Sequence, residues 1–108
     1  MVERIYSFLG LAAKAGKLLS GEESCERALK SGKVYLVIVS EDASDNTKKK
    51  FRDMCNYRNI EIRYYGEKDL LGSYTGKRVR SVIAVTEIGF ARHLKEMIDN
   101  RGIEHGGV

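Results

Sequence analysis

The sequence predicts an α/β fold, a three-layer α/β/α sandwich in which helices cover both faces of a small, mixed sheet of about four strands. Segments with apolar residues at helical spacing alternate along the chain with short apolar runs, a pattern typical of this class. The run at residues 34–39 has no polar alternation, which predicts a strand covered on both faces. At 108 residues, 43% of them apolar, the chain can bury one core but is too short for two domains.

The first helix is indicated by apolar residues that recur three or four positions apart, Ile5, Phe8, Leu9 and Ala12. Gly16 is expected to end this helix after Ala15. The next residues, 17–19, are long enough only for a strand fragment.

A second, short helix is expected to start at Ser20 or Gly21. Ser20 followed three residues later by Glu23 has the form of a capping box, in which two side chains bond free backbone amides at the helix start. Gly32 is expected to end the helix at the C′ position, where a left-handed conformation costs glycine little. The apolar stripe of this helix is Cys25, Ala28 and Leu29.

The remaining elements continue the alternation. They are expected as a loop at 40–44, a helix at about 45–57, an edge or half-covered strand at 60–64, a short helix at 67–71 ended by Gly72, a loop at 73–79, a strand at 81–85 and a closing helix through Phe90 and Ile98. A single domain is therefore expected at residues 1–99. Residues 100–108 lack periodicity and are expected to form a flexible glycine-rich tail.

Several function classes lack support in the sequence. It contains no phosphate-binding glycine loop, HExxH pair or GxSxG turn, so no enzymatic activity, cofactor or metal is expected. Cys25 and Cys55 lie far apart on apolar helix stripes, which predicts buried thiols. No apolar run approaches the roughly twenty residues of a membrane span. A cytoplasmic protein with no membrane partner and no small-molecule substrate is therefore expected.

An acidic pair, Glu41 and Asp42, follows the buried strand, at a position where open α/β sheets often bind ligands. A metal or small nucleotide site is one interpretation. Capping of the following helix by Asp42 or Ser44 explains the same residues and is favoured.

Positive charge gathers in two places, although the net charge is only +4. Residues 48–52 are expected to lie on the outward face of the third helix. Residues 77–80 follow a glycine in a loop, so a solvated helix face does not explain them.

The start of the second helix is a candidate binding site. Its free amides and positive dipole end suit an anion, but Glu22 and Glu23 repel phosphate. A carboxylate can instead accept a hydrogen bond from a base amino group. Arg27 can pair with Glu23 one turn away or reach a phosphate. The residues alone leave these interpretations open.

Three spaced blocks carry a resemblance to a known family. They are Gly21-x-x-Ser24-x-x-Arg27-Ala28-Leu29-x-x-Gly32, the run at residues 36–44, and Leu71-Gly72-x-x-x-Gly76. In this order they resemble the kink-turn RNA-binding ribosomal protein family. The residues at positions 21–23, 41–47 and 84–91 are similar to those of its bacterial YlxQ-type members. The similarity covers residues 3–99.

The resemblance implies an α/β/α sandwich and a non-catalytic protein that binds structured RNA. The expected RNA is a kink-turn, a sharply bent element with tandem sheared G·A pairs, or a related element of rRNA, and ribosome association belongs to this expectation. The residues expected to contact RNA are Lys17, Gly21, Glu22, Glu23, Ser24, Arg27, Ser44, Lys77, Arg78 and Val79.

The resemblance has one local departure. Glu23 and Ser24 stand where the family usually has Asn-Glu, which makes a protein-interaction module that has lost strong RNA binding the alternative function. RNA binding requires the start of the second helix and the cationic loop beyond Gly76 to lie side by side.

Overall fold

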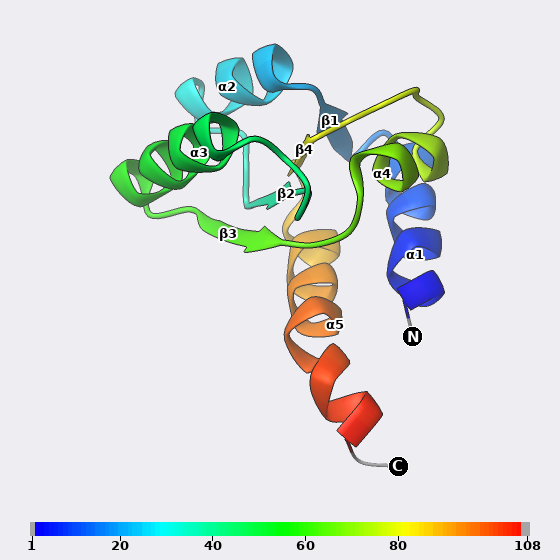
Figure 1. The fold of residues 1–108 in the computed structure, drawn as a ribbon. Coiled ribbons are helices and arrows are strands. Elements are labelled where there is room, and N and C mark those ends of the chain that lie inside the picture. The colour runs from blue at the N-terminus through cyan, green and yellow to red at the C-terminus, as the bar shows by residue number, and fades with distance from the viewer. Residues whose placement is uncertain (1, 107–108) are drawn as a thin grey trace.

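The computed structural model describes residues 2–106, with side chains from Arg4 to Arg101, and these residues form five helices and four strands (Figure 1). The helices are α1 (Val2–Lys14), α2 (Glu22–Lys30), α3 (Asp45–Arg58), α4 (Lys68–Tyr74) and α5 (Ile88–Gly106). The strands are β1 (Leu18–Ser20), β2 (Leu36–Val39), β3 (Glu61–Tyr64) and β4 (Val82–Val85). None of the described helices has both the length and the apolar composition that crossing a bilayer requires.

The four strands form one mixed sheet, as the sequence predicted, and their order is β1-β4-β2-β3. β4 runs antiparallel to both of its neighbours, and β2 is parallel to β3. Consequently β1, β2 and β3 all end at the same edge of the sheet, where β4 begins. The register pairs Ser20 with Ile83 and Val39 with Val82 at this edge.

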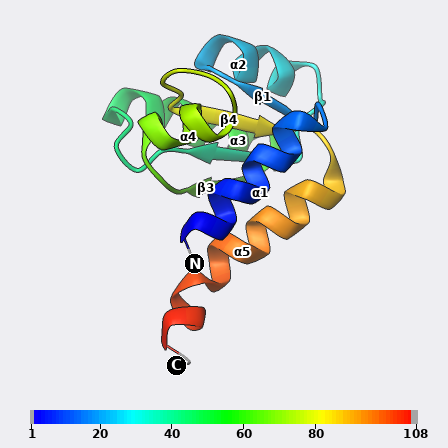
Figure 2. The ribbon, with the colours of Figure 1, turned by 90° about the vertical axis from the view of Figure 1, so that its right-hand side faces the viewer.

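Helices cover both faces of the sheet, which confirms the three-layer architecture. α1, α4 and α5 pack on one face, nearest the viewer in Figure 2, and α2 and α3 pack on the other. The side chains of the two central strands alternate between these layers, and every residue of β2 and β4 is at most 1% exposed. The core under α1, α4 and α5 takes Leu36, Ile38, Ile83 and Val85, and the other core takes Val37, Val39, Val82 and Ala84.

Three helices end in the same motif, a glycine at C′ followed by a lysine. Gly16, Gly32 and Gly76 have φ of 74°, 74° and 77°, a left-handed conformation that favours glycine. The lysine amide then donates to a carbonyl five residues earlier, which satisfies a free helix-end acceptor. These bonds are Lys17 to Ala12 (2.9 Å), Lys33 to Ala28 (3.1 Å) and Lys77 to Gly72 (2.8 Å). The helix ends predicted at Gly16 and Gly32 are confirmed.

The prediction that the short helix ends at Gly72 is wrong. α4 continues to Tyr74, and Gly72 is buried within it. A Cβ atom on Gly72 would lie 1.6 Å from the backbone oxygen of Arg78, so the loop after α4 packs directly on the helix here. This glycine therefore permits a close backbone approach.

The capping box at Ser20 is also wrong. Gly21 is the N-cap of α2, with φ of 94°, and no side chain caps this helix. Ser20 is the last residue of β1.

α5 continues past the domain end expected at residue 99, and its last turns extend beyond the sheet (Figure 1). Arg101 lies over the ring of Tyr65 at 5.4 Å and 3.8 Å from a carboxylate oxygen of Glu41. Residues 100–106 are thus helical where a tail was expected, and the rest of that tail, 107–108, lies outside the described residues.

Candidate nucleic-acid interface

The start of α2 and the loop between α4 and β4 lie side by side (Figure 1). β1 leads directly into α2, and the antiparallel pairing places the beginning of β4 next to the end of β1. The Gly21 amide donates to the Val82 carbonyl at 2.9 Å. Arg80 Nε donates to Ser20 Oγ at 3.0 Å, which joins the loop to the last residue of β1. The arrangement required for RNA binding is therefore present.

The start of α3 is the third element at this edge. Ser44 is its N-cap, and Ser44 Oγ accepts from the Thr47 amide at 3.1 Å, which confirms the expected capping. The Ser40 amide donates to the Ser81 carbonyl at 2.8 Å, so the loop before α3 is joined to the loop before β4.

Glu22 is held against α3. Thr47 Oγ1 donates to Glu22 Oε2 at 2.8 Å and accepts from Ser44 Oγ at 3.0 Å. Lys50 Nζ lies 4.0 Å from the other oxygen of Glu22. These contacts use the Glu22 carboxylate to tie the starts of two helices together.

Glu23 faces solvent instead, with a side chain that is 94% exposed. Its ion-pair partner in the described part of the chain is Arg27, at 4.0 Å and 72% exposed. An exposed pair of this kind contributes only about 0.3–0.5 kcal/mol. A ligand can therefore recruit either side chain at little cost, and Ser24 lies half-buried on the same turn.

Cys25 anchors this turn on the sheet. Its thiol donates to the Leu19 carbonyl at 3.6 Å and to the Val82 carbonyl at 3.7 Å. Burial raises the pKa of Cys25 to about 12, so the thiol is neutral at physiological pH. Cys55 is also buried, and the prediction of two buried thiols is confirmed.

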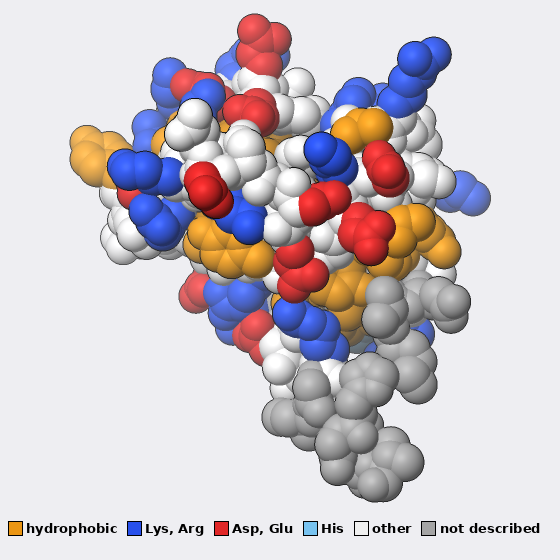
Figure 3. All heavy atoms as spheres, viewed as in Figure 1, with side chains coloured by type: hydrophobic (Ala, Val, Ile, Leu, Met, Phe, Trp, Pro, Cys, Tyr) orange, Lys and Arg blue, Asp and Glu red, His pale blue; other side chains and the backbone are white. Residues whose placement is uncertain are grey.

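The cationic loop, defined here as residues 77–80, is exposed at Lys77, Arg78 and Val79. Neither Lys77 nor Arg78 has a side-chain hydrogen bond or ion pair among the described residues. Figure 3 shows Lys and Arg side chains projecting over this loop, with acidic and basic side chains interspersed over α2. Two basic side chains are thus available to an anionic ligand beside the start of α2.

Arg80 was missed as a candidate. It is half-buried and connects the cationic loop to Ser20, and it also donates to the Val79 carbonyl at 2.9 Å. The antiparallel pairing of β1 with β4 is the signal that would have placed it here, but sequence periodicity does not reveal which strands pair.

Lys17 lies apart from the other candidates. It precedes β1, at the opposite end of that strand from α2, and its carbonyl accepts from the Thr86 amide at 2.9 Å and from the Thr86 hydroxyl at 3.1 Å. The structure brings the remaining candidates to one edge of the sheet and leaves Lys17 outside this group.

The basic face of α3 points outward, as expected for a solvated helix face, and two of its lysines have partners within the protein. Lys49 lies 2.8 Å from Asp53, and Lys50 lies 2.8 Å from Glu26. The hydrogen bond from Lys50 lowers the pKa of Glu26.

The acidic pair after β2 has structural partners. Asp42 Oδ1 accepts from the Lys68 amide at 3.0 Å, so Asp42 caps α4 and not the helix that follows it in sequence. Burial opposes ionisation of Asp42, but the hydrogen bonds that it accepts lower its pKa. Glu41 lies near Arg101, and the described residues contain no group of three or more His, Cys, Asp or Glu side chains placed to hold a metal.

Comparison with known proteins finds relatives over most of the chain. Residues 3–95 match the model of the Ribosomal protein L7Ae/L30e/S12e/Gadd45 family. The chain is 39% identical over 94 residues to the RNA-binding protein YlxQ of Bacillus subtilis (strain 168), covering 87% of this chain and 94% of that protein. A solved structure of a Bacillus halodurans C protein of unknown function is 45% identical, with a TM-score of 0.85, and the match covers 88% of this chain and 96% of that one. The Giardia lamblia 15.5kD RNA binding protein shares the fold at a TM-score of 0.73 and 16% identity, over 87% of this chain and 83% of that one.

Proposed function

The chain belongs to the Ribosomal protein L7Ae/L30e/S12e/Gadd45 family, and on that premise we propose that it is a non-catalytic, cytoplasmic RNA-binding protein. The RNA that we expect it to recognise is a kink-turn or a related structured RNA, and rRNA elements are among the candidates. The observation that carries the proposal is the convergence of the α2 start, the α3 start and the cationic loop at one edge of the sheet. The name of the 39% identical relative, an RNA-binding protein, supports it.

Each element has a distinct role in this proposal. Lys77 and Arg78 contact the RNA backbone, where the arginine fork can hold a phosphate with two hydrogen bonds. Glu23 accepts from a base amino group, since Glu22 is held by Thr47 and Lys50. The rigid edge of the sheet then selects an RNA whose bend presents backbone and base edges together.

A protein-interaction module is the alternative, motivated by Glu22 and Glu23 at the helix start. Because Glu22 ties α2 to α3, Glu23 is the member of that pair that faces a ligand. One weakly paired carboxylate, that of Glu23, beside the free cations Lys77 and Arg78 favours RNA over an adaptor role.

The test is the affinity of a kink-turn RNA duplex for the double variant Lys77→Ala/Arg78→Ala, measured by gel shift over a range of salt concentrations. We expect weaker binding and a shallower dependence of log affinity on log salt, by about 0.7–0.9 for each lost phosphate contact.

Lys33→Ala is the matched control for this experiment. Lys33 is exposed and follows a helix-ending glycine as Lys77 does, but it lies beyond the far end of α2. Equal affinity and equal salt slope for the double variant and the control would refute a contact at the cationic loop. No binding of the duplex by the unmodified protein would favour the adaptor.

A further inference from the structure

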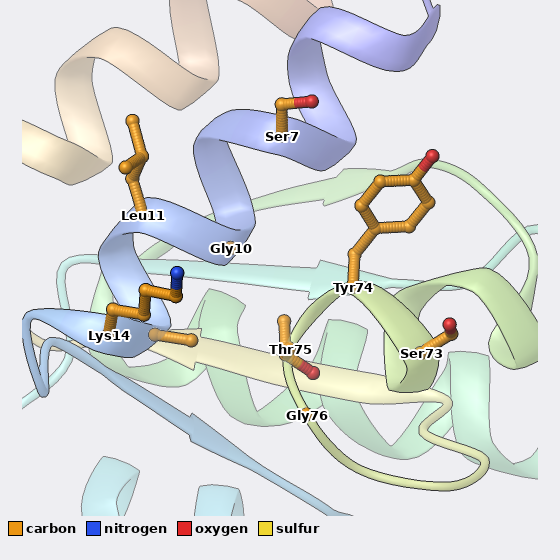
Figure 4. A pocket seen from close by; sticks show the side chains of 9 residues that line it. Ser7, Gly10, Leu11, Lys14, Ser73, Tyr74, Thr75 and Gly76 are labelled. Carbon is orange, nitrogen blue, oxygen red and sulfur yellow. The ribbon is translucent and has the colours of Figure 1, made fainter.

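A groove of about 490 Å³ lies between the second half of α1 and the end of α4 (Figure 4). Ser7 and Lys14 line it from α1, and Ser73, Tyr74 and Thr75 line it from the other side. The two helices touch closely beneath it, because a Cβ atom on Gly10 would lie 3.0 Å from the Tyr74 carbonyl oxygen. The volume lies in the range of pockets that hold small ligands, roughly 300–1,000 Å³, and suits one nucleotide.

The charge of the groove is positive. Lys14 supplies the charged side chain of the lining, and the lining contains no carboxylate. Figure 4 shows this side chain extending from α1 toward the side formed by Thr75. Lys14 is exposed and has no side-chain hydrogen bond or ion pair with the described residues. The groove therefore offers an uncommitted cation to an anionic occupant.

The groove also has a fixed aromatic wall. The ring of Tyr74 stacks on that of Tyr6, with centroids 5.0 Å apart and an angle of 20° between the planes, and Tyr74 remains 39% exposed. Tyr6 is held in turn, since its hydroxyl accepts from the Glu67 amide at 3.0 Å. Packing a base against Tyr74 therefore costs little entropy, because stacking on Tyr6 already orders the Tyr74 ring.

The lining of the groove ends at the residue that precedes the cationic loop in the chain. Gly76 belongs to its lining, and Lys77 and Arg78 are the next two residues of the chain. An RNA strand that reaches Gly76 from the cationic loop then enters a groove whose lining contains no carboxylate.

We propose that this groove binds a single-stranded segment flanking the structured RNA, with a base against Tyr74, a phosphate at Lys14 and polar contacts from Ser7 and Ser73. The inference rests on the proposed function and extends it from a folded element to its flanking strand. Positive charge combined with an aromatic surface is the usual means of binding single strands without sequence preference. The same charge and the cationic loop that follows the lining in the chain favour RNA over a peptide.

The experiment compares the blunt kink-turn duplex with duplexes that carry four unpaired uridines at each strand end in turn. We expect one of these extensions to tighten binding by about tenfold, which lies within the range for stacking one base on an aromatic side chain. Lys14→Glu is expected to abolish this gain in affinity. Lys33→Glu makes the same charge change near the end of another helix, α2, and is expected to keep the gain. Ser73→Glu introduces a carboxylate from the other wall and is expected to abolish the gain as well, which keeps the test valid if Lys14→Glu disturbs α1.

The outcomes separate this inference from the proposed function. If the blunt duplex binds and the cationic loop variant weakens it, but no extension tightens binding, the groove inference is overturned and the proposed function stands. An extension gain that survives both Lys14→Glu and Ser73→Glu also overturns it, because the strand then lies elsewhere. If the unmodified protein does not bind the blunt duplex, the proposed function fails and this inference fails with it.

Discussion

At the scale of single residues, Gly72 decides where the cationic loop lies. The sequence suggested that this glycine ends a helix, yet it lies inside α4 beneath the backbone of Arg78. A glycine can mark either a turn or a close approach, and periodicity alone does not distinguish them.

We expect Gly72→Ala to lower the free energy of unfolding by about 1–3 kcal/mol and to weaken RNA binding. The added Cβ would lie 1.6 Å from a backbone oxygen, so the loop itself must move. Urea denaturation and gel shifts measure the two effects. Gly89→Ala is the control, since the nearest atoms to its Cβ would be those of the Glu87 carboxylate at 3.2 Å, a side chain that can shift although it accepts from the Phe90 amide, and alanine is ordinarily the better helix residue. A Gly72→Ala protein as stable as the control would contradict this account.

The exposed carboxylate of Glu23 gives a second prediction at this scale. We expect Glu23→Ala to weaken kink-turn binding by about 5- to 150-fold, which corresponds to roughly 1–3 kcal/mol for one base contact. Glu23→Gln keeps a carbonyl acceptor and should lose less. Isothermal titration of both variants provides the measurement. Tighter binding by Glu23→Ala would show instead that this carboxylate repels phosphate.

At the scale of elements, the start of α3 combines a cap with a link to α2. Ser44, Thr47 and Glu22 form one chain of hydrogen bonds. The cap was predictable because serine before a helix is a local signal, but the link to Glu22 depends on how two helices pack on the sheet. The capping box at Ser20 failed for the same reason, since strand pairing with β4 determines the conformation of that residue.

We expect Ser44→Ala to destabilise the protein by about 1 kcal/mol through loss of the cap, and Ser44→Asn to restore most of that stability. Because Ser44 Oγ is engaged by Thr47, we expect Ser44→Asn to bind the kink-turn duplex about as tightly as the unmodified protein. Thermal unfolding and gel shifts on the same samples check this. A large loss of affinity in a stable Ser44→Asn protein would mean that the serine contacts RNA directly.

At the scale of the whole molecule, the strand order β1-β4-β2-β3 assembles the candidate site. The alternation of helices and strands in the sequence was enough to predict three layers, because each element shows one or two apolar faces. It did not give the order of the strands, so it could not place Arg80 against Ser20 or separate Lys17 from the other candidates. Such placements depend on contacts between residues far apart in the chain.

The sheet order also predicts a pattern of amide hydrogen exchange. β2 and β4 are central and fully buried, so their amides should exchange only through global unfolding. β1 and β3 are the edge strands and should exchange through smaller openings. Exchange followed by NMR with increasing denaturant measures the free energy of each opening. Equal protection of β1 and β4 would contradict this hierarchy.

The glycine–lysine ends of α1, α2 and α4 separate the backbone role of a residue from its electrostatic role. In each motif the lysine contributes its amide to closing the helix, and its side chain takes no part in that bond. Replacing Lys17, Lys33 or Lys77 by a neutral or acidic residue therefore leaves the fold intact. Over evolutionary time, the corner at Lys77, which belongs to the cationic loop, is therefore where descendants of the chain can change their choice of RNA without compensating changes in the core.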